Sequence, residues 1–243
     1  MERTYKTVYA WLVHLFTASG AIFGILALYE VYKGSMFLAF LYIAITIIID
    51  AIDGTFARLI DIKKYANIDG ALLDNIIDFL TFVIVPCFII LTGSIVSEDW
   101  KIPSMIMIAL ASCYQFTQLD AKTDDHFFKG FPSYWNITVF YLYYWQTTHT
   151  TNIIIIAVLA VLTFVPIKYI YPSRMNFISK SKCVRTLMFS ATIVWGAATL
   201  ALLFTYPNKA PILNAICIIY IAWYFLFSLY LTFFPIDYKK KTK

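Results

Sequence analysis

Residues 37–58 read F-L-A-F-L-Y-I-A-I-T-I-I-I-D-A-I-D-G-T-F-A-R. The stretch is uncharged up to Asp50, carries a second carboxylate at Asp53 and ends at Arg58. A helix needs about 20 apolar residues to cross a bilayer, and the apolar segment over 35–57 has that length. Carboxylates inside such a segment are costly in lipid and mark functional positions that face a cavity. The stretch therefore predicts a membrane helix that ends in a functional site.

The composition of the whole chain also indicates a membrane protein. Of its 243 residues, 61% are hydrophobic and 14% are charged, and the mean hydropathy is +0.74. This composition excludes a soluble enzyme and leaves no room for a second, soluble domain, so residues 1–243 are expected to form one membrane domain. Apolar segments lie at about 8–32, 35–57, 71–95, 102–119, 133–147, 151–172, 184–206 and 211–235. We expect an all-α polytopic bundle of about eight transmembrane helices.

Positive charges divide unevenly between alternate loops. If the N-terminus is cytoplasmic, sixteen Lys and Arg residues fall on the cytoplasmic side, and only Lys33, Lys101 and Lys209 fall on the other. Cytoplasmic loops carry such an excess, and the bias requires an even number of spans, so both termini are expected inside. The net charge of +5 follows from this topology and does not indicate nucleic-acid binding.

Four carboxylates lie at the facing ends of the second and third apolar segments. Asp50 and Asp53 are spaced i, i+3, and Asp74 and Asp78 are spaced i, i+4, so each pair projects from one helix face. The connection over 58–70 is short enough to make the two helices antiparallel neighbours. Clustered carboxylates need counter-charge, and oxygen ligands favour hard ions such as Mg²⁺ or Mn²⁺. The spacing therefore predicts a site for one or two divalent ions.

Small residues and an arginine accompany these carboxylates. Gly54 lets the backbone approach a ligand closely, Ala57 leaves space one turn further on, and Arg58 offers a planar fork for phosphate oxygens. A metal site with these neighbours is suited to a diphosphate. Cation or proton pathways in transporters also use carboxylates within the membrane, so the spacing alone leaves a transporter open as an alternative.

The same residues carry a family resemblance. From Asp50 the chain reads D-A-I-D-G-T-F-A-R, then eleven residues, then G-A-L-L-D-N-I-I-D up to Asp78. This resembles the signature D-x-x-D-G-x-x-A-R … G-x-x-x-D-x-x-x-D of the CDP-alcohol phosphotransferases at all eight fixed positions. The long gap before Gly70 is similar to that of the family's bacterial phosphatidylcholine synthase branch. Further stretches that resemble this branch lie at 13–20, 78–86, 125–136 and 164–169.

The resemblance implies both a fold and a reaction. Members of the family use an alcohol to displace CMP from a CDP-linked lipid. In this branch, choline would react with CDP-diacylglycerol to give phosphatidylcholine and CMP. Synthases for serine, inositol or glycerol phosphate are the alternative within the family. The resemblance further implies a six-helix family core with two additional helices, and a homodimer.

The roles of individual residues follow from the same resemblance. Two Mn²⁺ or Mg²⁺ ions would be bound by Asp50, Asp53, Asp74 and Asp78. The CDP diphosphate would lie against Asp53, Gly54, Ala57, Arg58 and Gly70. Asp78 would also be the general base toward the alcohol. The active site is expected on the cytoplasmic side of the bacterial inner membrane, where CDP-diacylglycerol, choline and membrane lipids meet.

Choline poses a separate recognition problem. Its quaternary ammonium offers no N–H and is best held over aromatic rings, with a carboxylate nearby. An interfacial aromatic belt would explain the same rings without choline, so that alternative stays open. His14, in the first segment, is expected to pack between helices, with substrate contact as the alternative. The choline candidates are Trp135, Tyr134, Tyr114, Phe131 and Asp120, with Asp124 and Asp125 adding negative charge nearby.

Overall fold

A computed structural model describes the chain over residues 2–59, 62–123, 125, 127–171 and 181–234. The chain divides into two compact units, one of residues 1–109 and 134–153 and the other of residues 110–133 and 154–243. Helices α5 (Glu98–Thr117) and α7 (His149–Leu162) each begin in the first unit and end in the second.

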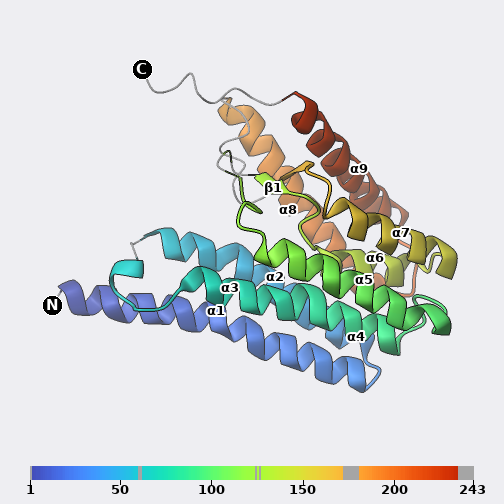
Figure 1. Cartoon of the computed structure of the whole chain (residues 1–243), viewed down its shortest axis with the longest axis horizontal. Coiled ribbons are helices and arrows are strands. Elements are labelled where there is room, and N and C mark those ends of the chain that lie inside the picture. Colours follow the sequence, from blue (N-terminus) through green and yellow to red (C-terminus); the bar gives the residue numbers. More distant parts are fainter. Residues whose placement is uncertain (1, 60–61, 124, 126, 172–180, 235–243) are drawn as a thin grey trace. The chain divides into compact units, whose positions relative to one another are not determined.

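The first unit contains the segments that carry the predicted site. Its third apolar segment is continuous, because α3, η2 and α4 follow one another without a break from Gly70 to Thr92. Helix α1 packs along α2 and along this continuous segment, as Figure 1 shows. The elements of this unit, besides the start of α5 and of α7, are α1 (Glu2–Tyr32), α2 (Met36–Leu59), the 3-10 turn η1 (Ile62–Lys64), α3 (Gly70–Asp78), the π-helix η2 (Phe79–Ile84), α4 (Val85–Thr92) and α6 (Trp135–Trp145).

Two glycines allow α1 to lie close to the third segment. A Cβ atom at Gly20 would be 2.9 Å from Cγ2 of Ile77, and one at Gly24 would be 2.9 Å from Cδ2 of Leu80. Small residues are the usual means by which membrane helices approach one another closely. The glycines therefore hold α1 against the segment that carries Asp74 and Asp78.

The second unit combines helices with a two-stranded sheet. Strands β1 (Phe127–Lys129) and β2 (Lys168–Ile170) are antiparallel, and Phe128 is paired with Tyr169. Helices α8 (Lys182–Thr205) and α9 (Pro211–Phe233) complete the unit. The Tyr224 hydroxyl of α9 donates a hydrogen bond of 3.1 Å to the carbonyl of Ile170, which fixes the sheet to this helix.

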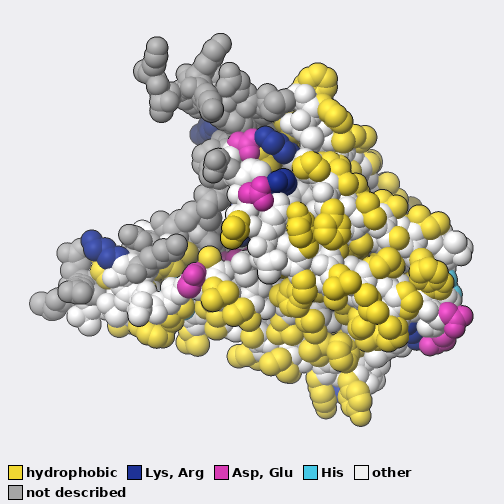
Figure 2. Space-filling view, in the orientation of Figure 1, with side chains coloured by type: hydrophobic (Ala, Val, Ile, Leu, Met, Phe, Trp, Pro, Cys, Tyr) yellow, Lys and Arg dark blue, Asp and Glu magenta, His cyan; other side chains and the backbone are white. Residues whose placement is uncertain are grey.

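The structure confirms the polytopic helical class. Each of the eight predicted apolar segments contains a helix, and five of the described helices are long and apolar enough to cross a membrane. These are Thr4–Tyr32, Met36–Ala57, Gly70–Thr92, Lys182–Thr205 and Pro211–Phe233. Exposed apolar residues such as Leu15 and Ile219 cover the helices, and Figure 2 shows hydrophobic side chains over much of the visible face. Such a surface suits contact with lipid.

The shorter helices differ from the predicted boundaries. Helix α6 has 11 residues and α7 has 14, so at about 1.5 Å per residue neither alone matches the hydrocarbon core of about 30 Å. The segment expected over 151–172 leaves the helical conformation after Leu162, and β2 occupies 168–170. Pro166 follows shortly after the helix and has no N–H with which to continue it. The orientation of the termini stays a prediction.

Candidate metal and nucleotide site

Three carboxylates from two helices meet in the first unit. One oxygen from each of Asp50, Asp74 and Asp78 lies within 4.8 Å of the others, and all three residues are partly buried. Asp50 lies on α2, whereas Asp74 and Asp78 lie one turn apart on α3. Oxygen ligands of Mg²⁺ or Ca²⁺ lie about 2.0–2.6 Å from the ion, so two that share an ion are at most about 5 Å apart. The three side chains therefore have the spacing and chemistry to hold a divalent ion.

The fourth predicted ligand, Asp53, is placed differently. Its residue is only 6% exposed, which makes it the most buried of the four aspartates, and the group of three converging carboxylates does not include it. The structure thus brings together three of the four predicted ligands. A role for Asp53 at the metal or the diphosphate stays a prediction.

The predicted diphosphate residues flank this cluster along α2. Gly54 is partly buried one residue after Asp53, and Ala57 lies one turn further on. The side chain of Arg58 lies outside the part of the chain that the structure describes. Ala57 packs against an apolar cluster that joins α1 to the connection after α2 and is formed by Ala10, Val13, Ile62 and Ala66, with Tyr9 and Tyr65 beside it.

The N-terminus of α3 is shaped by Asp69 and Gly70. The Asp69 carboxylate accepts hydrogen bonds of 3.1 Å from the backbone N–H groups of Ala71 and Leu72 and so caps the helix. Gly70 follows as the first residue of α3, and a Cβ atom there would be only 3.0 Å from Cε1 of His14. The glycine of the motif therefore allows α1 to contact the start of the helix that carries Asp74.

A π-helix follows directly after Asp78. Residues Phe79–Ile84 form η2, and the Thr81 hydroxyl donates to the Ile77 carbonyl at 3.0 Å. Short π-helical segments inside longer helices occur frequently at functional sites. The sequence pattern did not predict this segment. Pro86 was the available signal, because it has no N–H to bond the carbonyl four residues earlier and so disturbs the helix that precedes it.

The choline candidates divide between the two units. Trp135 and Tyr134 belong to the first unit, where Trp135 is fully buried and the Tyr134 ring lies 6.2 Å from the ring of Phe82. Tyr114 and Phe131 belong to the second unit. The Tyr114 ring lies 4.7 Å from the ring of Phe164, and that of Phe131 lies 6.3 Å from Tyr169. Three of the four candidate rings, Tyr134, Tyr114 and Phe131, thus pack against another aromatic ring.

The carboxylates near these rings are paired with lysines in the second unit. Asp120 accepts a hydrogen bond of 2.6 Å from Lys129, and this bond, followed by one from Gln118, lowers the pKa of Asp120. Asp124 lies outside the described residues. Asp125 forms an ion pair with Lys168 and accepts a hydrogen bond from the Thr123 hydroxyl. Burial acts to raise the pKa of Asp125, but the bonds from Lys168 and Thr123 outweigh it and hold this pKa below its usual value.

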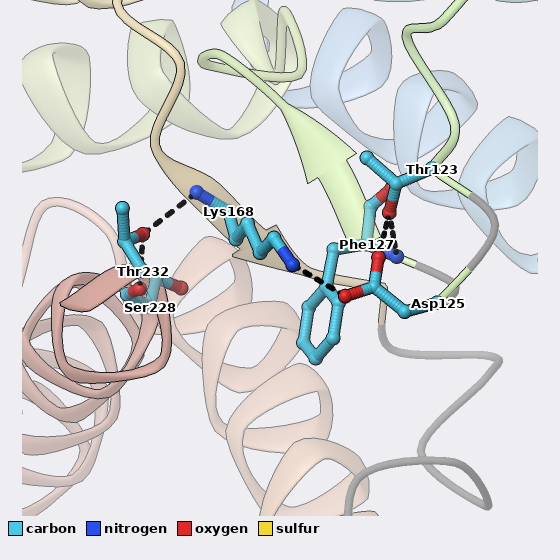
Figure 3. A network of polar contacts seen from close by, with 6 residues as sticks. All are labelled: Thr123, Asp125, Phe127, Lys168, Ser228 and Thr232. Atoms are coloured by element: carbon cyan, nitrogen blue, oxygen red, sulfur yellow. Dashed lines mark hydrogen bonds and ion pairs between the residues drawn. The ribbon is translucent and has the colours of Figure 1, made fainter. Parts of the chain in front are cut away.

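The ion pair of Asp125 joins two stretches that are far apart in the sequence, as Figure 3 shows. Strand β1 and Asp125 lie in the stretch 125–136, and β2 begins with Lys168 in the stretch 164–169. The backbone N–H of Lys168 donates a hydrogen bond of 2.8 Å to the Thr232 hydroxyl of α9. Both stretches resemble the same branch of the family in sequence, but their pairing was not predicted. Their opposite charges were the only local signal.

Comparisons with known proteins agree with the family suggested by the motif. The family model CDP-alcohol phosphatidyltransferase matches residues 11–165, which include the three converging carboxylates. Phosphatidylcholine synthase of Legionella pneumophila is 43% identical over 235 residues, which cover 96% of this chain and 92% of the relative. The proteins of the same name from Legionella bozemanae and Borreliella burgdorferi are 42% and 37% identical and cover 88% and 93% of this chain, and 100% and 95% of their own lengths. The chain belongs to the CDP-alcohol phosphatidyltransferase family.

Proposed function

We propose that this protein is a phosphatidylcholine synthase, which transfers the phosphatidyl group of CDP-diacylglycerol to choline and releases CMP. The observation that carries the proposal is the 43% identity to a protein of that name over 96% of the chain. The convergence of Asp50, Asp74 and Asp78 supports it, because the chemistry requires a site for a diphosphate and its counter-ions.

The carboxylate cluster is the proposed metal centre. Asp50, Asp74 and Asp78 would hold Mg²⁺ or Mn²⁺, and Asp53, one turn from Asp50, would contribute to a second ion or to the diphosphate. When bound, the ions neutralise the diphosphate and the charge that develops on departing CMP. The all-oxygen donor set fits such hard ions and disfavours softer metals.

The chain's own residues would position the substrates and transfer one proton. Asp78 takes the proton of the choline hydroxyl, and the hydroxyl oxygen forms a bond to the phosphorus that carries diacylglycerol. The bond from that phosphorus to the oxygen of CMP breaks, and CMP leaves with the bonding electrons. Asp78 then releases its proton to solvent. Arg58 would hold phosphate oxygens as a fork, while Gly54, Ala57 and Gly70 leave room for the nucleotide.

Choline recognition is proposed for the aromatic rings of the predicted set. Tyr134 is partly exposed and Tyr114 is 42% exposed, whereas Trp135 and Phe131 are buried. Rings that are at least partly exposed can offer a face to a quaternary ammonium without repacking. In the second unit, Asp120 adds a negative charge, which Lys129 partly offsets. Within each unit the more exposed ring is therefore the first choline candidate, Tyr134 ahead of Trp135 in the first unit and Tyr114 ahead of Phe131 in the second.

The membrane setting is part of the proposal. The charge bias of sixteen to three supports an orientation in the bacterial inner membrane with both termini and the active site facing the cytoplasm. Labelling of single cysteines introduced at the exposed residues Asn67 and Lys122, in a variant without the four native cysteines, from either side of the membrane, tests this orientation. The homodimer implied by the family resemblance is a separate expectation, and cross-linking in native membranes tests it.

The reaction itself is tested with purified full-length protein in mixed micelles of CDP-diacylglycerol. Choline, serine, inositol and glycerol phosphate are supplied one at a time with Mn²⁺ or Mg²⁺, and the lipid product is identified by mass spectrometry. We expect phosphatidylcholine and equimolar CMP with choline alone. A different product lipid would show that another alcohol is the acceptor. The absence of CMP release with every alcohol would refute the transferase reaction.

A further inference from the structure

A histidine on α1 is buried with an unsatisfied ring nitrogen. His14 is only 4% exposed, and its Nε2 atom has no hydrogen-bond partner among the described residues. Buried polar groups are nearly always paired, and one left unpaired costs about 1–3 kcal/mol. A histidine retained only for packing between helices would carry this cost without compensation. A partner from outside the described residues would remove the cost.

The ring that carries the unpaired nitrogen packs against the start of α3. The Cε1 atom of His14 is 3.0 Å from the position of a Cβ atom on Gly70, and Nδ1 is 3.6 Å from the same position. No other atom of the His14 ring lies within 4 Å of that position, so the edge formed by Cε1 and Nδ1 faces Gly70 and Nε2 points away from it. Asp74 follows Gly70 by four residues on the same helix face, about 6 Å further along the axis. The His14 ring therefore contacts α3 about one helical turn before the first of its two converging carboxylates.

Two polar side chains, one on α1 close to His14 in sequence and one next to Gly70, already have partners. The Asp69 carboxylate accepts from Ala71 and Leu72, and the hydroxyl of Thr17, one turn after Val13 on α1, donates to the Val13 carbonyl. On the same helix, Ala10 and Val13 are buried in the apolar cluster with Ile62 and Ala66. Apolar side chains cannot satisfy an imidazole nitrogen. The partner of Nε2 is thus expected to be a ligand.

We propose that His14 Nε2 hydrogen-bonds a polar atom of the cytidine nucleotide half of the CDP-lipid, which makes His14 a further substrate-binding residue. The identity of the ligand rests on the proposed function. The choline ammonium has no N–H and no acceptor atom, and its one hydroxyl is required by Asp78. The nucleotide, by contrast, must extend from the metal-bound diphosphate and carries many donors and acceptors. A histidine ring nitrogen can donate to an acceptor or accept from a donor, so the nucleotide is the matching partner.

Binding of CDP tests this inference without requiring turnover. Full-length protein is titrated with CDP in the presence of Mn²⁺ and without choline. His14→Phe keeps a planar ring but removes both nitrogens, and we expect it to weaken CDP binding about five- to tenfold, as for one hydrogen bond. His14→Gln can place an amide near the Nε2 position and should recover part of the loss. His149→Phe is the matched control, because His149 is exposed and contacts Ser94 after α4.

Steady-state kinetics provide a second measurement. For His14→Phe, the KM for CDP-diacylglycerol should rise by a similar factor while the KM for choline stays within about twofold. Unchanged CDP affinity in His14→Phe overturns the inference. Equal weakening for both substrates, or a lowered melting temperature with no recovery in His14→Gln, also overturns it and indicates a packing role. If the wild-type protein binds CDP but forms no phosphatidylcholine, the proposed function fails, and the titration still decides the role of His14.

Discussion

Carboxylates are arranged in opposite ways in the two units. In the first unit, Asp50, Asp74 and Asp78 gather within 4.8 Å of one another, where like charges favour a bound cation. In the second unit, Asp120 and Asp125 are each paired with a lysine, which offsets their charge within the protein. The same residue type therefore indicates metal chemistry in one place and local structure in the other. Its partners decide which.

The largest effect is expected from loss of a converging carboxylate. Asp50→Asn or Asp74→Asn should lower CMP release by more than the 10- to 100-fold typical of changing a residue that only hydrogen-bonds and orients a metal ligand. Chelation should abolish activity in the wild type, and Mn²⁺ or Mg²⁺ should restore it while Zn²⁺ does so poorly. In the absence of metal, the variants should melt at or above the melting temperature of the metal-free wild type, because like-charge repulsion is relieved.

A carboxylate that is paired with a lysine is the control for this series. Glu98 is exposed and forms an ion pair with Lys101 at 2.8 Å, so Glu98→Gln should keep wild-type turnover. Full activity in excess chelator would remove the metal centre from the proposal. A low melting temperature for both aspartate variants would instead make the cluster a structural element.

The second effect separates packing from choline binding among the aromatic residues. Trp135 is fully buried, so Trp135→Ala should destabilise the protein by about 3–5 kcal/mol, measured as a fall in melting temperature and yield. Tyr134→Ala should instead raise the KM for choline several-fold, because one cation–π contact contributes about 0.5–2 kcal/mol. A stable Trp135→Ala protein with a raised choline KM would reverse these assignments.

The third effect concerns the contact between Gly70 and His14. An added Cβ would lie 3.0 Å from the His14 ring, so Gly70→Ala should shift that ring and raise the KM for CDP-diacylglycerol several-fold. The double variant with His14→Ala removes the clash. We therefore expect a non-additive cycle, with a coupling energy of about 0.5–3 kcal/mol for residues in contact. Additive effects would show that the two residues act independently.

The smallest effect is a pH dependence of the two-stranded sheet. Because the folded-state pKa of Asp125 is lowered, its contribution to stability is fully present above the ordinary aspartate pKa of about 3.9 and is lost as the pH falls below that value. The loss should be below about 1 kcal/mol for a partly exposed pair. Protection factors of the β1 amides, which are exchange rates corrected for the intrinsic rate at each pH, measure this loss between pH 6 and pH 3. Asp125→Asn should remove the difference between the two protection factors. A difference that persists in this variant would exclude Asp125 as its source.

Local patterns in the sequence determined the class of the protein and most of its candidate site. Apolar runs of about 20 residues predicted the membrane helices, because bilayer thickness sets helix length. The spacing of Asp74 and Asp78 predicted a shared face, because four residues complete about one helical turn. These relations hold within one helix, so they could be read without knowledge of the partners that the helix packs against.

Tertiary structure decided which residues meet across helices. Three carboxylates converge and Asp53 does not join them, because convergence depends on the rotation of α2 against α3 as well as on spacing. The contact of His14 with Gly70, and the ion pair of Asp125 with Lys168, join residues far apart in the chain. The burial of Trp135 was likewise not encoded in its own segment. Such contacts depend on how closely two elements pack, and local periodicity carries no information about that distance.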